Sequence, residues 1–243
     1  MPHRYADSDP LHSENLKAKQ RELRDGFSLT LTLRVHRALS WLRRAVKEDD
    51  DLDVQFIMLW IGFNAAYAGD LDRALDDQED ASNALDASRS YPNGERGRFR
   101  QFFHALLQMD SRHRIYDLIW NRFPHEIRLL LDNRYVYRPF WQAQRGEPGY
   151  DNWQQRFNGA KRAVAHALKE QDTLTLLEIL FDRLYVLRNQ LVHGGATWNS
   201  NANRSQVRDG AALLGCLLPV FIDLMMDHPH ADWSMPNYPV VED

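Results

Sequence analysis

The sequence predicts an all-α protein, folded as an antiparallel helical bundle. Apolar residues recur at three- and four-residue intervals over most of the 243 residues. No run rich in valine or isoleucine alternates with polar residues between turn dipeptides, so strand signals are nearly absent. Hydrophobic residues make up 44% of the chain, which is enough for a core and excludes a disordered protein. We therefore expect residues 1–243 to form a single helical domain.

The first part of the chain supplies the early bundle helices. We expect residues 1–26, which are polar, to be frayed or partly helical. A periodic apolar pattern predicts a helix over 28–48, and a second helix over 54–68 is apolar nearly all round, as in the middle of a bundle. Between them lies an acid run: Asp49, Asp50, Asp51 and Asp53. Carboxylates favour a helix start there; a metal cluster is the alternative, but no matching histidine set is present.

The middle of the chain, at about 70–149, is predicted to be a helical insertion. Residues 70–95 are acidic and weakly periodic, and the segment ends in Tyr-Pro-Asn-Gly, a sequence typical of turns. Shorter helices are expected at 95–109, 112–121, 124–132 and 134–143, followed by a loop at 145–149.

Three long helices are predicted to complete the bundle, before a C-terminal tail at 228–243. Their ranges are 151–169, 172–193 and 204–227. Pro219 lies inside the last helix, where we expect it to cause a kink. The lone cysteine, Cys216, lies on the same apolar helix and is predicted to be a buried, inert thiol.

Composition also bears on location. One cysteine cannot form an internal disulfide, which favours a reducing compartment. No stretch reaches about 18 apolar residues, and the polar start has no apolar signal core. We therefore expect a cytoplasmic protein without a membrane span.

Charge is unevenly distributed along the chain. The total is −4, but residues 1–95 carry −6 (12 basic, 18 acidic), residues 96–145 carry +6 (10 and 4) and residues 146–243 carry −4 (8 and 12). All ten basic residues of the middle block are arginines, and aromatic residues lie among them. Arginines grip phosphates and rings stack on unpaired bases, so this block could guide single-stranded or looped RNA. The alternative is that the rings are core and the arginines a solvated face.

Standard catalytic, metal and cofactor signatures are absent, so we expect no metal and no cofactor. The chain has no phosphate loop, no His-Glu-x-x-His and no Cys-x-x-Cys. One constellation remains at the end of the helix predicted over 172–193. Arg188, Asn189 and His193 lie off its apolar stripe, and two glycines then end the helix.

These residues suit cleavage of RNA. Five residues span about 140° around a helix and about 7.5 Å along it, a gap that an arginine can cover. Histidine can take or give a proton near neutral pH, and a guanidinium can hold a phosphate in the transition state. The alternative to a catalytic site is an ordinary helix C-terminus with a favourable basic residue. The spacing alone does not decide between them, because the composition yields about one Arg-x4-His by chance.

Two motifs resemble those of HEPN (higher eukaryotes and prokaryotes nucleotide-binding) domains. Arg188 to Gly194, Arg-Asn-Gln-Leu-Val-His-Gly, resembles the Arg-x(4–6)-His motif of that family, including the polar residue after the arginine. Leu59 to Tyr67 is similar to the Trp-x-x-Phe-Asn-Ala helix of many members. The resemblance covers roughly 28–68 and 172–227 and has no counterpart for 70–149.

The resemblance implies an α-helical homodimer with a composite cleft. Many members are metal-independent endoribonucleases of toxin–antitoxin, defence or RNA-processing systems, and some have an antitoxin or nucleotidyltransferase partner. By resemblance, Arg188 and His193 are the active residues, with Asn189 beside them. The alternative is a non-enzymatic module that binds RNA, a nucleotide or a partner protein.

Four further residues are candidates for supporting or RNA-binding roles. Asn64 is either a structural bridge between helices or a group that orients Arg188 or His193. Trp198 either stacks a base or anchors its loop. Arg204 and Arg208 start the next predicted helix and could line the same cleft.

Overall fold

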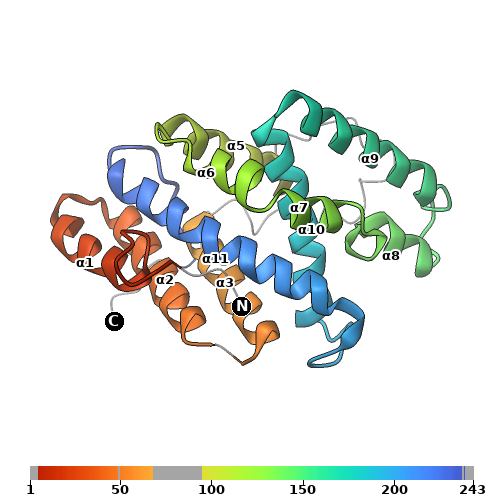
Figure 1. Ribbon diagram of the computed structural model, residues 1–243, viewed down its shortest axis with the longest axis horizontal. Helices are drawn as coiled ribbons and strands as arrows, with labels where there is room; N and C mark the ends of the chain where they lie inside the picture. The colour runs from red at the N-terminus through yellow and green to blue at the C-terminus, as the bar shows by residue number, and fades with distance from the viewer. Residues whose placement is uncertain (1–4, 49, 68–94, 237, 239–243) are drawn as a thin grey trace.

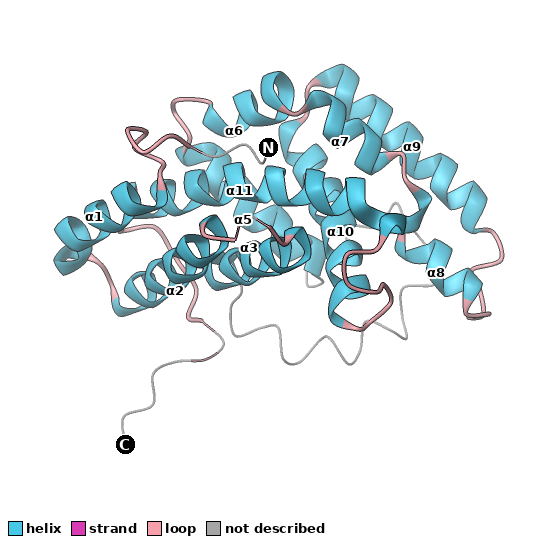
Figure 2. Cartoon of the chain, turned by 60° about the horizontal axis from the view of Figure 1, so that its bottom comes forward, coloured by secondary structure: helices cyan, strands magenta, loops and turns pink. Residues whose placement is uncertain are grey.

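A computed structural model describes residues 5–48, 50–67, 95–236 and 238, and its regular elements in these ranges are all helical (Figures 1 and 2). The early helices are α1 (Ser13–Leu23), η1 (Arg24–Gly26), α2 (Leu29–Val46) and α3 (Leu52–Tyr67). The middle helices are α5 (Glu95–Met109), α6 (Arg114–Asp117), η3 (Leu118–Arg122), α7 (Pro124–Leu131), η4 (Arg134–Val136) and α8 (Arg138–Gln144). The late helices are α9 (Trp153–Glu170), α10 (Thr173–Val192), η5 (Asn201–Asn203) and α11 (Arg204–Asp227).

The all-α bundle predicted from the sequence is confirmed, with two local differences. The helix expected over 112–121 is α6 continued by a π-helical turn, η3. The helix expected over 134–143 is split, because Tyr137 is extended and a new helix, α8, begins at Arg138 with Pro139 in its first turn. Proline has no N–H to donate into a preceding helical turn, which explains the restart. The acidic segment at 70–94 lies outside the described residues.

Helix α11 is the central element of the bundle. It crosses the molecule in Figure 1 and contacts α1, α2, α3, α5, α6, α7 and α10. It continues as one helix through Pro219. By length and composition, Asn201–Asp227 could cross a membrane, contrary to the expectation that no segment is apolar enough. However, 89% of its most apolar part is buried by the rest of the bundle. The central helix of a soluble bundle has the same length and apolar composition, so these two properties are only weak evidence for a membrane span.

Five phenylalanines from four helices meet in the core. Phe63 of α3 lies 4.6 Å from Phe181 of α10, between ring centroids, and Phe181 lies 4.7 Å from Phe103 of α5. Phe99 and Phe221 pack on the same group. The described part of the predicted insertion is thus helical, and α5 is built into the common core.

Both ends of the described chain pack on this bundle. Leu16 of α1 is fully buried, so the N-terminal segment is more ordered than its polarity suggested. In the expected C-terminal tail, Ser234 accepts two hydrogen bonds from Arg34 of α2: Nε donates to its carbonyl oxygen (2.7 Å) and Nη2 to its hydroxyl (3.1 Å). Arg34 also donates to the carbonyl of Ala66, and its guanidinium is buried. One arginine therefore joins α2, the end of α3 and the segment after α11.

Candidate functional site at the end of α10

Helix α10 begins with a cap and buries its first four turns. Asp172 accepts a hydrogen bond from the backbone N–H of Thr175 at 3.0 Å. Burial raises the pKa of Asp172, but hydrogen bonds from Thr175 outweigh burial and hold this pKa below its usual value. The apolar stripe predicted from the sequence is buried as far as Leu187. The last turn, by contrast, carries polar side chains that reach the surface.

The helix ends where the sequence predicts. His193 is the C-cap residue, and its backbone N–H donates to the carbonyl of Asn189 at 3.0 Å. Gly194 follows with a φ of 69°, a left-handed conformation that glycine adopts without strain. The glycine stop therefore fixes the place of His193 at the tip of the helix.

Arg188 and His193 are both available to a ligand. Arg188 is half-buried, and its Nη1 donates to Oδ1 of Asn189 at 2.8 Å. Within the described part of the chain, no carboxylate pairs with Arg188 and no hydrogen bond engages the exposed ring of His193. A guanidinium whose charge is not neutralised by a carboxylate can bind an anion at little cost.

The two side chains leave the helix in different directions. A separation of five residues corresponds to about 140° around the helix axis. Val192 lies between them around the helix and is 50% exposed. Arg188, Val192 and His193 therefore follow one another around the end of α10, the first half-buried and the other two exposed.

Gln190, inside the motif, connects the last turn of α10 to both neighbouring segments. Its Nε2 donates to the carbonyl of Tyr135 in η4 at 2.5 Å. Its Oε1 accepts from Nδ2 of Asn203, at the end of the following loop, at 2.7 Å. The sequence did not single out Gln190, because its partners are 55 and 13 residues away.

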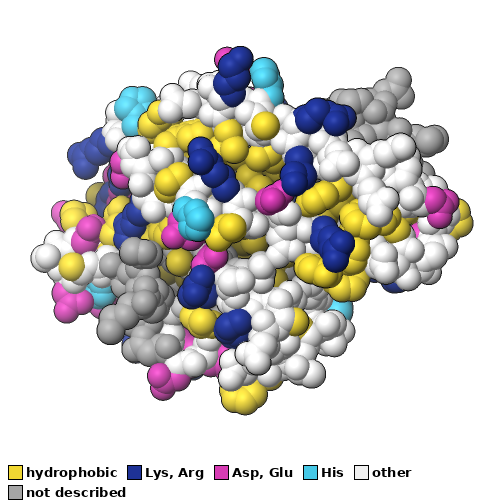
Figure 3. All heavy atoms as spheres, turned by 45° about the vertical axis from the view of Figure 1, so that its right-hand side comes forward, with side chains coloured by type: hydrophobic (Ala, Val, Ile, Leu, Met, Phe, Trp, Pro, Cys, Tyr) yellow, Lys and Arg dark blue, Asp and Glu magenta, His cyan; other side chains and the backbone are white. Residues whose placement is uncertain are grey.

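Two arginines of the predicted RNA-binding block lie near this part of α10: Arg138 contacts the helix itself, and Arg134 belongs to η4, which Gln190 contacts. The guanidinium of Arg138 lies 5.6 Å from the ring centroid of Tyr185, one turn before Arg188. That of Arg134 lies 5.0 Å from the ring of Tyr135. Neither pairs with a carboxylate among the described residues. The face that carries α8, α9 and α10 shows separate basic side chains with hydrophobic surface between them (Figure 3).

The rest of that block does not form one RNA surface. Arg100 pairs with Glu178, and Arg114 pairs with Asp223. Half of its ten rings are buried in the core, as the alternative interpretation expects: Phe99, Phe103, Phe123, Tyr137 and Phe140. Tyr135 is the most exposed ring of the block, at 42%.

The loop after His193 is held by the acid run before α3. Oδ1 of Asp51 caps α3 by accepting from the N–H groups of Asp53 and Val54, both at 3.0 Å, which confirms the predicted helix start. Oδ2 of Asp51 accepts from the indole N–H of Trp198 at 2.5 Å. Asp53 accepts from Nη2 of Arg204 at 2.8 and 3.0 Å. No group of three or more metal-binding side chains occurs among the described residues.

The four supporting candidates therefore differ in role. Trp198 is a loop anchor through its N–H, yet its side chain remains 74% exposed. Arg204 is engaged by Asp53, and Arg208, which is exposed, pairs with its neighbour Asp209. Asn64 is half-buried on α3, and within the described residues no hydrogen bond joins it to Arg188 or His193.

The two helices that carry the HEPN-like motifs contact each other. The ring centroid of Trp60, on α3, lies 6.1 Å from that of Tyr185, on α10. Helix α3 also packs along α11, so its apolar motif forms part of the support beneath α10. Residues 59–67 thus contribute to packing between helices.

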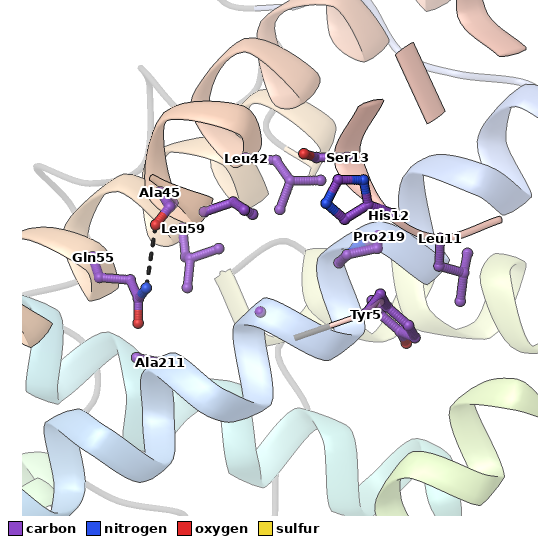
Figure 4. A pocket seen from close by; sticks show the side chains of 12 residues that line it. Tyr5, Leu11, His12, Ser13, Leu42, Ala45, Gln55, Leu59, Ala211 and Pro219 are labelled. Atoms are coloured by element: carbon purple, nitrogen blue, oxygen red, sulfur yellow. Dashed lines mark hydrogen bonds between the residues drawn. The ribbon is translucent and has the colours of Figure 1, made fainter. Parts of the chain in front are cut away.

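A pocket lies elsewhere, between the N-terminal segment, α2, α3 and α11 (Figure 4). Leu42, Leu59 and Pro219 give it an apolar wall, and Tyr5 and His12 close it from the N-terminal side. None of the residues that line it belongs to α10. The pocket and the predicted site are therefore different places.

The sequence matches no family model, no curated protein and no solved structure. The likeness to HEPN domains accordingly rests on the two sequence motifs alone.

Proposed function

We propose that the protein is a metal-independent endoribonuclease of the HEPN type, with its site at the end of α10. The observation that supports this most directly is the state of Arg188 and His193. Both lie at one helix end, and neither is engaged by a carboxylate of the described chain. Arg138 adds positive charge one turn away, beside Tyr185. A phosphodiester is the ligand that suits this combination of guanidinium, imidazole and basic surroundings.

The proposed reaction needs only these groups and the RNA itself. The 2′-hydroxyl oxygen attacks the adjacent phosphorus, the P–O5′ bond breaks, and a 2′,3′-cyclic phosphate and a 5′-hydroxyl are formed. A base removes the 2′-hydroxyl proton, and an acid protonates the departing 5′ oxygen. His193 serves as the proton-transfer group, and Arg188 stabilises the charge that develops on the phosphate oxygens.

A dimer would supply both proton-transfer groups at once. One chain offers one His193, whereas the reaction uses a base and an acid. A second copy placed against the end of α10 would add a second His193 and would cover the exposed Val192. We therefore include a homodimer, with α10 ends facing each other, in the proposal.

The test is RNA cleavage by the purified protein in the presence of a chelator. His193→Ala and Arg188→Ala should each reduce cleavage by about a hundredfold or more. His104→Ala and Arg21→Ala are matched controls, because these side chains are exposed on α5 and α1. Both controls should cleave like the wild type, and size-exclusion chromatography should show that all four variants keep the same oligomeric state.

Undiminished cleavage by the Arg188→Ala/His193→Ala double variant would contradict the proposal. Absence of cleavage by the wild type, combined with RNA or nucleotide binding, would favour the non-enzymatic alternative. In cells, an active ribonuclease should slow growth when expressed, and His193→Ala should relieve the effect. Such toxicity would support a role in defence or as a toxin with an antitoxin or nucleotidyltransferase partner.

A further inference from the structure

Two exposed aromatic rings belong to segments that are hydrogen-bonded to the end of α10. Tyr135 of η4 is 42% exposed, and Trp198 of the following loop is 74% exposed. Both segments are joined to Gln190: η4 through the Tyr135 carbonyl, and the loop through Asn203. The motif turn that carries Arg188 and His193 is therefore bonded to both segments that carry these rings.

Each ring is held in place before any ligand arrives. The indole N–H of Trp198 donates to Asp51, so the edge of the ring is fixed while most of its surface remains open. The hydroxyl of Tyr135 accepts from Nη2 of Arg134 at 2.9 Å. The Tyr135 carbonyl also accepts from the indole N–H of Trp141 at 2.7 Å, which fixes the backbone. A ring that is already ordered loses little conformational entropy when it binds a flat partner.

We propose that Tyr135 and Trp198 are stacking positions for the unpaired bases of a single-stranded RNA bound at the end of α10. Base–aromatic stacking requires bases outside a duplex, so the substrate class is single-stranded or looped RNA, read by its ring faces. This inference rests on the proposed function for the position of the phosphate. It adds Tyr135 as a binding residue and assigns the stacking role to Trp198.

The surroundings of the two rings differ in charge, which gives the proposal a second signature. Arg134 lies against the ring of Tyr135, and Arg138 is four residues further on. Trp198, by contrast, donates its indole N–H to the carboxylate of Asp51. Phosphate contacts are therefore expected on the Tyr135 side. Loss of Arg134 should reduce the salt dependence of binding. Loss of Trp198 should lower the affinity but leave the salt dependence unchanged.

The experiment measures binding, not cleavage. Fluorescence anisotropy is recorded with a labelled single-stranded RNA of about ten nucleotides, longer than one site contacts. The protein carries His193→Ala in every case, so the probe stays intact. A duplex RNA of the same length is the comparison ligand.

Tyr135→Ala and Trp198→Ala should each weaken single-strand binding by about tenfold or more. Tyr135→Phe and Trp198→Phe should retain most of the affinity, because the ring faces remain. Tyr238→Ala is the matched control, since Tyr238 is 68% exposed in the segment after α11. Circular dichroism should show the same helix content in all variants, as these side chains are at the surface.

Unchanged affinity of both alanine variants, relative to Tyr238→Ala, would overturn the inference. Equal affinity for the duplex would overturn it as well. If the wild type cleaves RNA but the ring variants bind normally, the inference fails and the proposed ribonuclease stands. If the ring variants bind weakly but no preparation cleaves RNA, the stacking sites stand and the ribonuclease fails.

Discussion

Nη1 of Arg188 donates a hydrogen bond to Oδ1 of Asn189, the adjacent residue, at 2.8 Å. The amide oxygen orients the guanidinium and leaves its positive charge in place, whereas a carboxylate would neutralise that charge. Asn189 also anchors the end of the helix, because its carbonyl accepts from the backbone N–H of His193. Asn189 is therefore the residue through which the positions of Arg188 and His193 are connected.

This arrangement predicts different effects for two substitutions of Asn189. Asn189→Asp places a carboxylate against Arg188, so kcat/KM for RNA cleavage should fall by about a hundredfold, as when a transition-state donor is lost. Asn189→Ala leaves the charge of Arg188 available but unoriented, so the loss should be smaller, about tenfold. The measurement is steady-state cleavage of one RNA at fixed pH. Equal activity of Asn189→Asp and the wild type would contradict the role assigned to Arg188.

The ion pair between Asp53 and Arg204 makes a prediction on stability. It joins the start of α3 to the start of α11, and Asp53 also accepts from the N–H of Asn199 at 2.8 Å. Their side chains are 11% and 27% exposed. Asp53→Ala therefore leaves Arg204 and the backbone N–H of Asn199 without their partner in a largely buried environment. The free energy of unfolding in urea should fall by about 1–3 kcal/mol.

Arg145→Ala is the matched control for that pair. Arg145 pairs with Glu147, and both side chains are well exposed, at 61% and 36%. Its loss should change the free energy of unfolding by less than about 0.5 kcal/mol. Similar effects of Asp53→Ala and Arg145→Ala would show that the loop after His193 is not held by Asp53.

The helices could be predicted from sequence because local signals agreed with the packing. Ser28 caps α2 by accepting from the N–H of Leu31, Asp51 caps α3, and Gly194 ends α10. Each of these is readable within a few residues. Pro139 was also a local signal, for a break between two helices. The prediction of one helix over 134–143 followed the apolar pattern instead and was wrong at this point.

The site was only partly predictable, because its contacts join distant segments. Spacing identified Arg188, Asn189 and His193 on one helix end. Nothing local to Gln190 reveals that it binds Tyr135, 55 residues earlier. The engagement of Arg204 by Asp53, 151 residues apart, is equally a property of the fold.

Two glycines of α11 should respond in opposite ways to alanine. A Cβ on Gly210 would lie 2.9 Å from Cε2 of Phe56 and 3.0 Å from Cδ2 of Leu184, so these buried side chains or α11 itself would have to shift. The overpacking should exceed the gain in helix propensity, for a net loss of about 1–2 kcal/mol in the free energy of unfolding. A Cβ on Gly215 would meet Leu59 at an ordinary 3.8 Å.

Gly215→Ala should therefore stabilise the protein, by up to about 1 kcal/mol. Urea unfolding of the two variants side by side is the measurement. Stabilisation by Gly210→Ala would mean that α11 packs less closely on Phe56 than the structure shows.

The thiol of Cys216 should be unreactive in the folded protein. Burial raises the pKa of Cys216 to about 11, and its side chain is buried in the core. The thiolate, which is the reactive form, is therefore scarce at pH 8, and reagents cannot reach it. Labelling with iodoacetamide, followed by mass spectrometry, should be negligible for the native protein and complete in urea. Rapid stoichiometric labelling of the native protein would contradict the packing of α11.

The stability contributed by Asp51 should depend on pH. Burial raises the pKa of Asp51, but hydrogen bonds from Val54, Trp198 and Asp53 outweigh burial and lower this pKa from its ordinary 3.8. A depressed pKa means that the folded protein favours the carboxylate, so the contribution is present above about pH 4 and is lost as the pH falls through the folded-state pKa. Asp51→Ala should thus cost about 1 kcal/mol at pH 7, typical of a lost helix cap. The difference from the wild type in free energy of unfolding should shrink as the pH is lowered below about 4. A difference that stays constant down to that range would show that the charge of Asp51 does not hold α3 and Trp198 together.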